Sequence, residues 1–100
     1  MSYTYIIHEL AQKDYEESLS WYLERSQQAA ENFVIAVDHA LSQICSHPDH
    51  WRNSYKNYYE YSLKKFPFNI VFVKEPDKQL IIITAIYHHK RNPKKKYRKI

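Results

Sequence analysis

The 100-residue sequence contains no glycine, although roughly 7% glycine, about seven residues, would be average for a chain of this length. Several ligand-binding loops need glycine where the backbone turns tightly or where a phosphate approaches closely. A P-loop, a dinucleotide-binding fingerprint and an EF-hand loop are therefore excluded. Two-residue hairpin turns built on Asn-Gly are excluded for the same reason. Any phosphate that this chain binds must be held by side chains or by a helix N-terminus.

Cysteine and long apolar runs are also scarce. Cys45 is the single cysteine, so no internal disulfide can form, and its place among helically spaced apolar residues favours a buried, inert thiol over a nucleophile. The longest apolar run, residues 80–87, is far shorter than the ~20 residues that cross a bilayer. The N-terminus lacks the basic start and small-residue cleavage site of a signal peptide. These features predict a cytoplasmic protein with no membrane association.

The charges divide unevenly along a chain whose length predicts one domain, residues 1–100, with one core. Residues 1–50 carry two Lys or Arg and eight Asp or Glu, whereas residues 51–100 carry thirteen and three. A basic C-terminal tail begins at about residue 90, with seven bases and no acid between Lys90 and Lys99. This asymmetry predicts a polyanionic partner for the second half, either nucleic acid or an acidic protein segment. The alternative is a solvated tail without a partner.

Hydrophobic periodicity predicts a strand followed by two helices in the first half. Residues 3–8 are typical of a short strand, and from residue 11 to residue 22 apolar side chains recur three or four apart, as in an amphipathic helix. Ser26 is expected to cap a second helix. That helix should end near Ser46, because Pro48 disfavours helical angles at the residue before it. The short link between the helices predicts an antiparallel helical hairpin.

The second half is predicted to form strands. Residues 53–66 are rich in tyrosine alternating with polar residues, residues 68–74 form a further strand, and residues 75–78 form a turn around Pro76. Residues 79–87 are apolar on both faces and are typical of a central strand. The predicted order is β-α-α-β-β-β. This is an α+β fold in which the helical hairpin packs on one face of a small, mainly antiparallel sheet.

The segment after the last predicted strand carries the strongest chemical signal. Residues 88–99 combine imidazoles at His88 and His89 with fixed lysine and arginine cations and the phenol of Tyr97. Cleavage of an RNA phosphodiester needs a base for the 2′-hydroxyl, a cation for the charge on the phosphorus centre and an acid for the leaving oxygen. The alternative is a tail that only contacts phosphates.

Three weaker patterns have structural alternatives. Lys64 and Lys65 could contact nucleic acid or could protect an edge strand. The tyrosines could stack on unpaired bases, although packing within the sheet is the favoured interpretation; they are Tyr55, Tyr58, Tyr59 and Tyr61. Histidine pairs at residues 47 and 50 and at residues 88 and 89 lack the spacing of a zinc site, so no metal or other cofactor is expected.

Taken together, the ordered motifs resemble the RelE/ParE superfamily of toxins from type II toxin–antitoxin systems, often labelled plasmid stabilisation proteins. The resemblance covers nearly the whole chain. Its motifs are AxxDYxESLxWY (residues 11–22), ENFVIAVDHALSQI (31–44), KKFPFNIVFV (64–73), IIITAIYH (81–88) and HHKRNP (88–93). The ordered pair FPFNIVF and AIYHHKRNP is the most specific part.

The resemblance implies a curved antiparallel sheet and a cognate antitoxin that wraps and neutralises the toxin. It leaves the assembly open between a homodimer and a toxin–antitoxin hetero-oligomer. It also implies one of two targets, because RelE-like members cleave mRNA in the ribosomal A site whereas ParE-like members poison DNA gyrase.

The resemblance also suggests roles for individual residues. His88 stands where some ribonuclease members have a catalytic histidine, and Arg91 and Tyr97 reproduce the spacing of an arginine and a C-terminal tyrosine used by others. Asn69 stands where nuclease members usually carry an arginine. Loss of that fixed cation could cost about 3 kcal/mol of transition-state stabilisation. The long side chain of Lys64 or Lys65 could reach the site and supply the missing charge.

The leading hypothesis is an endoribonuclease toxin, an mRNA interferase, that cleaves ribosome-bound mRNA without a metal. His88 would move protons, Arg91 would hold the phosphate, and Tyr97 would orient or protonate. Further nucleic-acid contacts are expected from Lys64, Lys65, Asn69, Lys90, Lys94, Lys95, Lys96 and Arg98. The alternatives are a non-enzymatic poison of DNA gyrase and a member that only binds its antitoxin.

Overall fold

The computed structural model describes residues 3–91 and 93–99. Asn92, which belongs to the HHKRNP motif, lies outside the described residues. The helices are α1 (Glu9–Leu23) and α2 (Gln27–Ser46), and the strands are β1 (Thr4–Ile7), β2 (Arg52–Tyr55), β3 (Tyr58–Ser62), β4 (Phe68–Glu75) and β5 (Leu80–His88). Short 3-10 turns lie at Pro76–Lys78 and Pro93–Lys95. No helix among these residues is long and apolar enough to cross a membrane.

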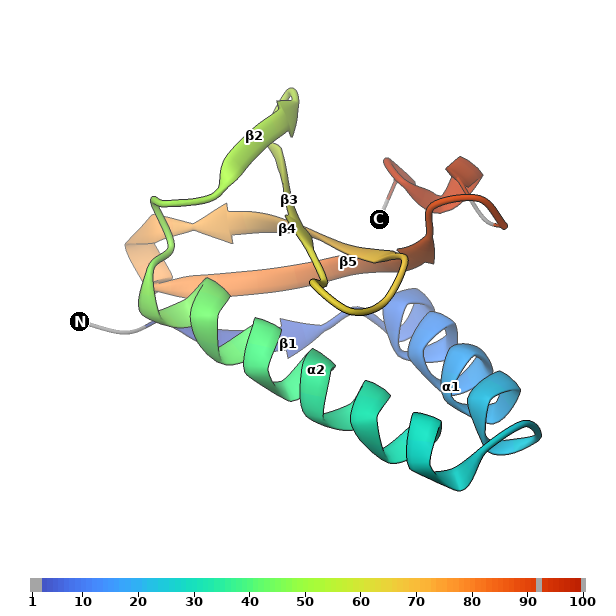
Figure 1. The fold of residues 1–100 in the computed structure, drawn as a ribbon. Coiled ribbons are helices and arrows are strands. Elements are labelled where there is room, and N and C mark those ends of the chain that lie inside the picture. The colour runs from blue at the N-terminus through green and yellow to red at the C-terminus, as the bar shows by residue number, and fades with distance from the viewer. Residues whose placement is uncertain (1–2, 92, 100) are drawn as a thin grey trace.

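The strands form one sheet in the order β1-β5-β4-β3-β2, with both helices on one face (Figure 1). β1 pairs parallel with β5, and the other neighbours pair antiparallel. The predicted α+β class and helical hairpin are confirmed. We call the side of the sheet that the helices cover the helix face.

The helix face holds the core, which forms because apolar residues recur at helical spacing along α2. Ser26 caps this helix as predicted, since its Oγ accepts a hydrogen bond from the amide of Ala29 at 3.1 Å. Phe33 is fully buried and contacts the rings of Tyr22, Phe66 and Phe68. The thiol of Cys45 is buried too, and burial raises its pKa, as expected for an inert thiol.

The tyrosine-rich stretch forms two strands, β2 and β3, where the sequence predicted one. Lys56 turns the chain with φ of 49°, a left-handed conformation that glycine usually supplies. The side-chain amide of Asn53 donates to the carbonyls of Lys56 (2.7 Å) and Tyr58 (3.1 Å) and so holds the turn closed. Hydrogen bonds from an asparagine side chain therefore stabilise a left-handed turn that contains no glycine.

A bulge at Thr84 changes which residues of β5 face the helices. Val71 of β4 is opposite Ala85, but its neighbour Phe72 is opposite Ile83, so Thr84 is the extra residue. Ile81 and Ile83 pack in the helix-face core before the bulge, and Ile86 packs there after it. His88 therefore shares the helix face with Ile86, while Tyr87 lies on the other side of the sheet.

That other side is crossed by the C-terminal segment, residues 93–99, which we call the tail; the side itself we call the tail face (Figure 1). The ring of Tyr97 stacks on Tyr55 with centroids 4.9 Å apart and leans on Tyr58 at 5.4 Å. Beneath it lies a small apolar cluster, formed by Val71, Ala85 and Tyr87. The tail is thus packed against the sheet.

Candidate functional site

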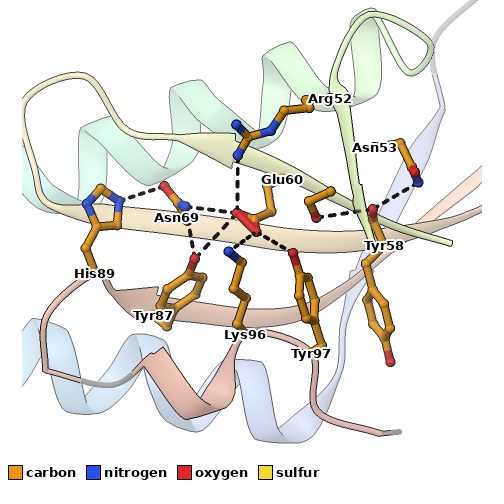
Figure 2. Close-up of polar contacts among 10 residues, drawn as sticks. Arg52, Asn53, Tyr58, Glu60, Asn69, Tyr87, His89, Lys96 and Tyr97 are labelled. Atoms are coloured by element: carbon orange, nitrogen blue, oxygen red, sulfur yellow. Dashed lines mark hydrogen bonds and ion pairs between the residues drawn. The ribbon is translucent and has the colours of Figure 1, made fainter. Parts of the chain in front are cut away.

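A buried carboxylate, Glu60 of β3, lies at the centre of a network of polar contacts on the tail face (Figure 2). Its side chain is only 1% exposed. Its Oε2 accepts hydrogen bonds from Asn69 Nδ2 at 3.0 Å and from the hydroxyl of Tyr87 at 3.4 Å. Its Oε1 accepts from the hydroxyl of Tyr97 at 3.4 Å. These donors come from β4, β5 and the tail, so Glu60 ties three segments together.

Two cations complete the surroundings of Glu60. The ammonium of Lys96 lies 3.4 Å from Oε1, and the guanidinium of Arg52 lies 3.7 Å from Oε2. Burial is the largest single influence and lowers the pKa of Lys96, but Glu60, Tyr87 and Tyr97 together outweigh it and leave that pKa raised. Lys96 is therefore a firmly charged group at this site. A buried carboxylate needs such partners, because an unpaired buried charge is strongly destabilising.

A hydrogen-bonded chain leads from Glu60 to His89 (Figure 2). The Nδ2 of Asn69 donates to Glu60 and also to Tyr87 at 3.1 Å, so the amide oxygen of Asn69 is left as the acceptor. The Nε2 of His89 lies 2.8 Å from that oxygen and must therefore carry a hydrogen. In the neutral ring the other nitrogen, Nδ1, then has the free lone pair. His89 is exposed, so its Nδ1 is accessible from solvent as a proton acceptor.

His88 has a different environment. Its Nδ1 accepts from the backbone amides of Lys90 and Arg91, both at 3.1 Å, and its ring packs edge-on against Phe68 at 5.2 Å. The neutral ring therefore holds its hydrogen on Nε2 and has no free lone pair for a substrate proton. Burial, together with Arg91, His89 and Lys90, lowers its pKa. This geometry gives His88 a structural part in closing the turn after β5.

Arg91 lies with His88 on the helix side of the molecule. Its guanidinium stacks on the ring of Trp21 of α1 at 4.4 Å and lies 5.9 Å from the ring of Phe68. Arg25 stacks on the same indole at 3.8 Å. The structure thus brings His88 and Arg91 together but holds Tyr97 on the opposite face of the sheet.

Asp14 of α1 is a second buried carboxylate and anchors the end of the tail. It is 2% exposed, accepts from the amide of Ile86 at 3.1 Å, and forms a two-pronged ion pair with Arg98, each contact 3.1 Å. Lys95 adds a third contact at 3.0 Å. Arg98 also donates to the carbonyl of Thr84 at 3.4 Å. Asp14 and Arg98 therefore bond the amide of Ile86 and the carbonyl of Thr84, which lie on β5 beyond its last residue paired with β1.

The predicted nucleic-acid contacts fall into three groups. Lys95, Lys96 and Arg98 are committed to Asp14 or Glu60, and Asn69 belongs to the Glu60 network. Lys90 and Lys94 are exposed. Lys64 and Lys65 are exposed as well, at the rim of a cavity of about 550 Å³ between α2 and the chain entering β4.

Sequence reasoning did not single out Glu60, Tyr87 or Asp14, and it gave His89 no role apart from its place beside His88 in the basic segment and in a rejected metal site. One signal was available for Glu60, because it is one of only three acids in the basic half of the chain. Among the described residues no group of three potential ligands from His, Cys, Asp and Glu is arranged to hold a metal ion.

The model of the family described as "ParE toxin of type II toxin-antitoxin system, parDE" matches residues 5–93. The chain belongs to this family. It is therefore a toxin of a type II toxin–antitoxin system. A comparison with curated protein sequences gives no significant match.

Solved structures of related toxins share the fold. An E. coli RelE double mutant in the free state superposes with a TM-score of 0.63 at 12% identity, covering 93% of this chain and 90% of that one. The isolated E. coli RelE toxin gives 0.63 at 13% identity, covering 90% and 87%. The RelBE2 toxin–antitoxin complex of Mycobacterium tuberculosis gives 0.62 at 10% identity, covering 88% and 99%. At this level of identity the likeness shows the fold alone.

Proposed function

We propose that this toxin inhibits translation by cleaving ribosome-bound mRNA, and that His89 rather than His88 accepts the proton. The observation that carries the proposal is the chain Glu60–Asn69–His89, which fixes the tautomer of His89 and presents the Nδ1 lone pair to solvent. A histidine base is usually oriented by a third group that hydrogen-bonds to its other ring nitrogen, and here Asn69 is that group, held in turn by Glu60.

In the proposed reaction, Nδ1 of His89 takes the proton of a ribose 2′-hydroxyl. The 2′-oxygen then forms a bond to phosphorus while the bond from phosphorus to the 5′-oxygen breaks. The products are a 2′,3′-cyclic phosphate and a 5′-hydroxyl, whose proton comes from Tyr97 or Lys96. Both groups lie on the tail face beside Glu60.

The cations at the proposed site are Lys96 and Arg52, not Arg91 as the sequence hypothesis had it. Asn69 supplies no charge, but Lys96 and Arg52 lie around the same carboxylate that Asn69 contacts. We propose that a phosphate binds at this edge of the network, where these two cations stabilise developing negative charge. Lys90 and Lys94, both exposed, would contact neighbouring phosphates.

Primer extension on messages in a purified ribosome system tests the proposal. The wild-type toxin is expected to produce defined cuts, and His89→Ala is expected to reduce cleavage about 10²-fold or more, as for loss of a general base. His88→Asn is the matched control, because the asparagine can still accept the turn amides, and it should cleave at a rate close to wild type. An uncut message with the wild type, or equal cleavage by His89→Ala, would contradict the proposal.

A second candidate is inhibition of DNA gyrase without catalysis. The match to the ParE family model favours it, and so does the commitment of Lys95, Lys96 and Arg98 to carboxylates of the chain itself. A supercoiling assay distinguishes the two functions. Inhibition of gyrase by both the wild type and His89→Ala, with no RNA cleavage by either, would support this candidate.

A further inference from the structure

The two edges of the sheet are built differently. β2 forms one edge, and it carries Arg52, a register shift after Asn53, and the side-chain hydrogen bonds of Asn53 to its own turn. Charges and irregularities of this kind prevent an edge strand from pairing with another chain. β1 forms the other edge with the sequence TYII, which contains no charge and no proline.

β1 is the last strand at one side of the sheet (Figure 1), and it exposes apolar side chains. Tyr5 is 43% exposed and Ile6 is 53% exposed. The amides of Thr4 and His8 donate toward β5, to the carbonyls of Gln79 at 3.0 Å and Ile83 at 2.9 Å. Because backbone groups alternate along a strand, the N–H and C=O groups of Tyr5 and Ile7 point away from β5. Among the described residues β1 pairs only with β5, and the outward groups of Tyr5 and Ile7 have no other backbone partner, whereas the amide of Tyr3 donates to the carbonyl of Cys45 at 3.0 Å.

We propose that β1 is a homodimerisation edge, at which β1 pairs antiparallel with β1 of a second copy of this chain about a two-fold axis at Ile6. In this register Tyr5 lies opposite Ile7 of the partner, and Ile7 opposite Tyr5. The outward backbone groups of both copies are then satisfied reciprocally. Two five-stranded sheets become one continuous sheet of ten strands.

The chemistry of β1 favours a second copy as the occupant. The groups that can pair, on Tyr5 and Ile7, are placed symmetrically about Ile6, as a two-fold interface requires. Residues 3–7 are uncharged, so their pairing brings no like charges together. Ile7 packs with the helix-face core, so Ile6 points to the opposite side of the sheet. There its exposed side chain meets its own symmetry mate.

Measurement of the mass of the full-length toxin in solution over a concentration series tests the proposal. The apparent mass should rise from one chain toward two, and Ile6→Lys should weaken the dimer roughly tenfold or more by placing two ammonium groups at the axis. The control is Ile35→Lys, since Ile35 is 65% exposed on α2, and it should dimerise as the wild type does. Thermal melting confirms that both variants are folded.

Disulfide trapping tests the register itself. Residues opposite each other at a non-hydrogen-bonded antiparallel position have Cα atoms about 4.5 Å apart, within the range of a disulfide. In a Cys45→Ala background, Ile6→Cys should therefore oxidise to a covalent dimer, whereas Ile35→Cys should not. A wild type that stays monomeric at every concentration, or dimerisation unaffected by Ile6→Lys, would overturn the proposal. A monomer whose β1 becomes protected only when antitoxin is added would assign the edge to a partner strand instead.

Discussion

The two faces of the sheet are stabilised by different physical means. The helix face buries a continuous apolar core around Phe33, Phe68 and Phe72, whereas the tail face has only a small apolar cluster beside the buried carboxylate of Glu60, and the tail itself is anchored by the buried carboxylate of Asp14. An apolar core tolerates substitutions that conserve volume, but a buried charge becomes strongly destabilising when one of its partners is removed. The helix face should therefore set the overall stability, and the tail face should be sensitive to single polar substitutions.

The largest loss of stability is expected from a cavity in the helix face. Phe33→Ala removes a fully buried ring that contacts Tyr22, Phe66 and Phe68, and should lower the free energy of unfolding by about 3–5 kcal/mol. Urea unfolding measures the change. Ile35→Ala, at an exposed position on the same helix, should change it by less than ~0.5 kcal/mol, and a similar loss in both variants would contradict the assignment of the core.

The anchoring of the tail should respond nearly as strongly to the loss of one carboxylate. Asp14→Ala leaves the amide of Ile86 without its acceptor and Arg98 without its ion pair, and about 3 kcal/mol of stability should be lost. Glu17→Ala is the control, because Glu17 is 71% exposed and its contact with Lys95, at 3.8 Å, is long and weak. A double-mutant cycle with Arg98→Ala should show coupling, and strictly additive effects would count against the proposed anchoring of the tail.

A smaller effect should appear in the pH dependence of stability. The pKa of His88 is lowered by burial and by Arg91, His89 and Lys90. The unfolded chain therefore binds more protons than the folded chain as the pH falls through the ordinary imidazole range near ~6.5, and stability is lost on acidification. His88→Asn should flatten this slope while preserving the turn. Urea unfolding at a series of pH values from neutral to mildly acidic measures it, and an unchanged slope would exclude His88 as a source.

Local signals in the sequence were sufficient for most of the fold. Ser26 and Pro48 marked the start and end of α2, and the periods of the apolar residues separated helices from strands. The β2–β3 hairpin was missed because its left-handed turn at Lys56 depends on side-chain hydrogen bonds from Asn53. That contact has no local signature comparable to Asn-Gly.

The site was harder to predict because it depends on register. The bulge at Thr84 reverses the alternation of β5, so it decides that His88 faces the helices and that Tyr87 faces the tail. Nothing in the run of isoleucines that precedes it indicates where the extra residue lies. Without that information the choice between two adjacent histidines could not be made from the sequence.

The anchoring of the tail could not be foreseen either. Asp14 and Arg98 are separated by 84 positions, and each resembles an ordinary exposed charge in the sequence. A run of bases is usually solvated, so the ion pairs of Lys95 and Arg98 with Asp14 became visible only in the folded chain.

The most direct measurement is the rate of ribosome-dependent mRNA cleavage by Asn69→Ala. This variant keeps His89 but removes the amide that links it to Glu60. If the tail face performs the chemistry through this chain, cleavage should fall at least ~10-fold relative to wild type, because the imidazole loses its fixed tautomer and orientation. Cleavage by Asn69→Ala at the wild-type rate would contradict this mechanism.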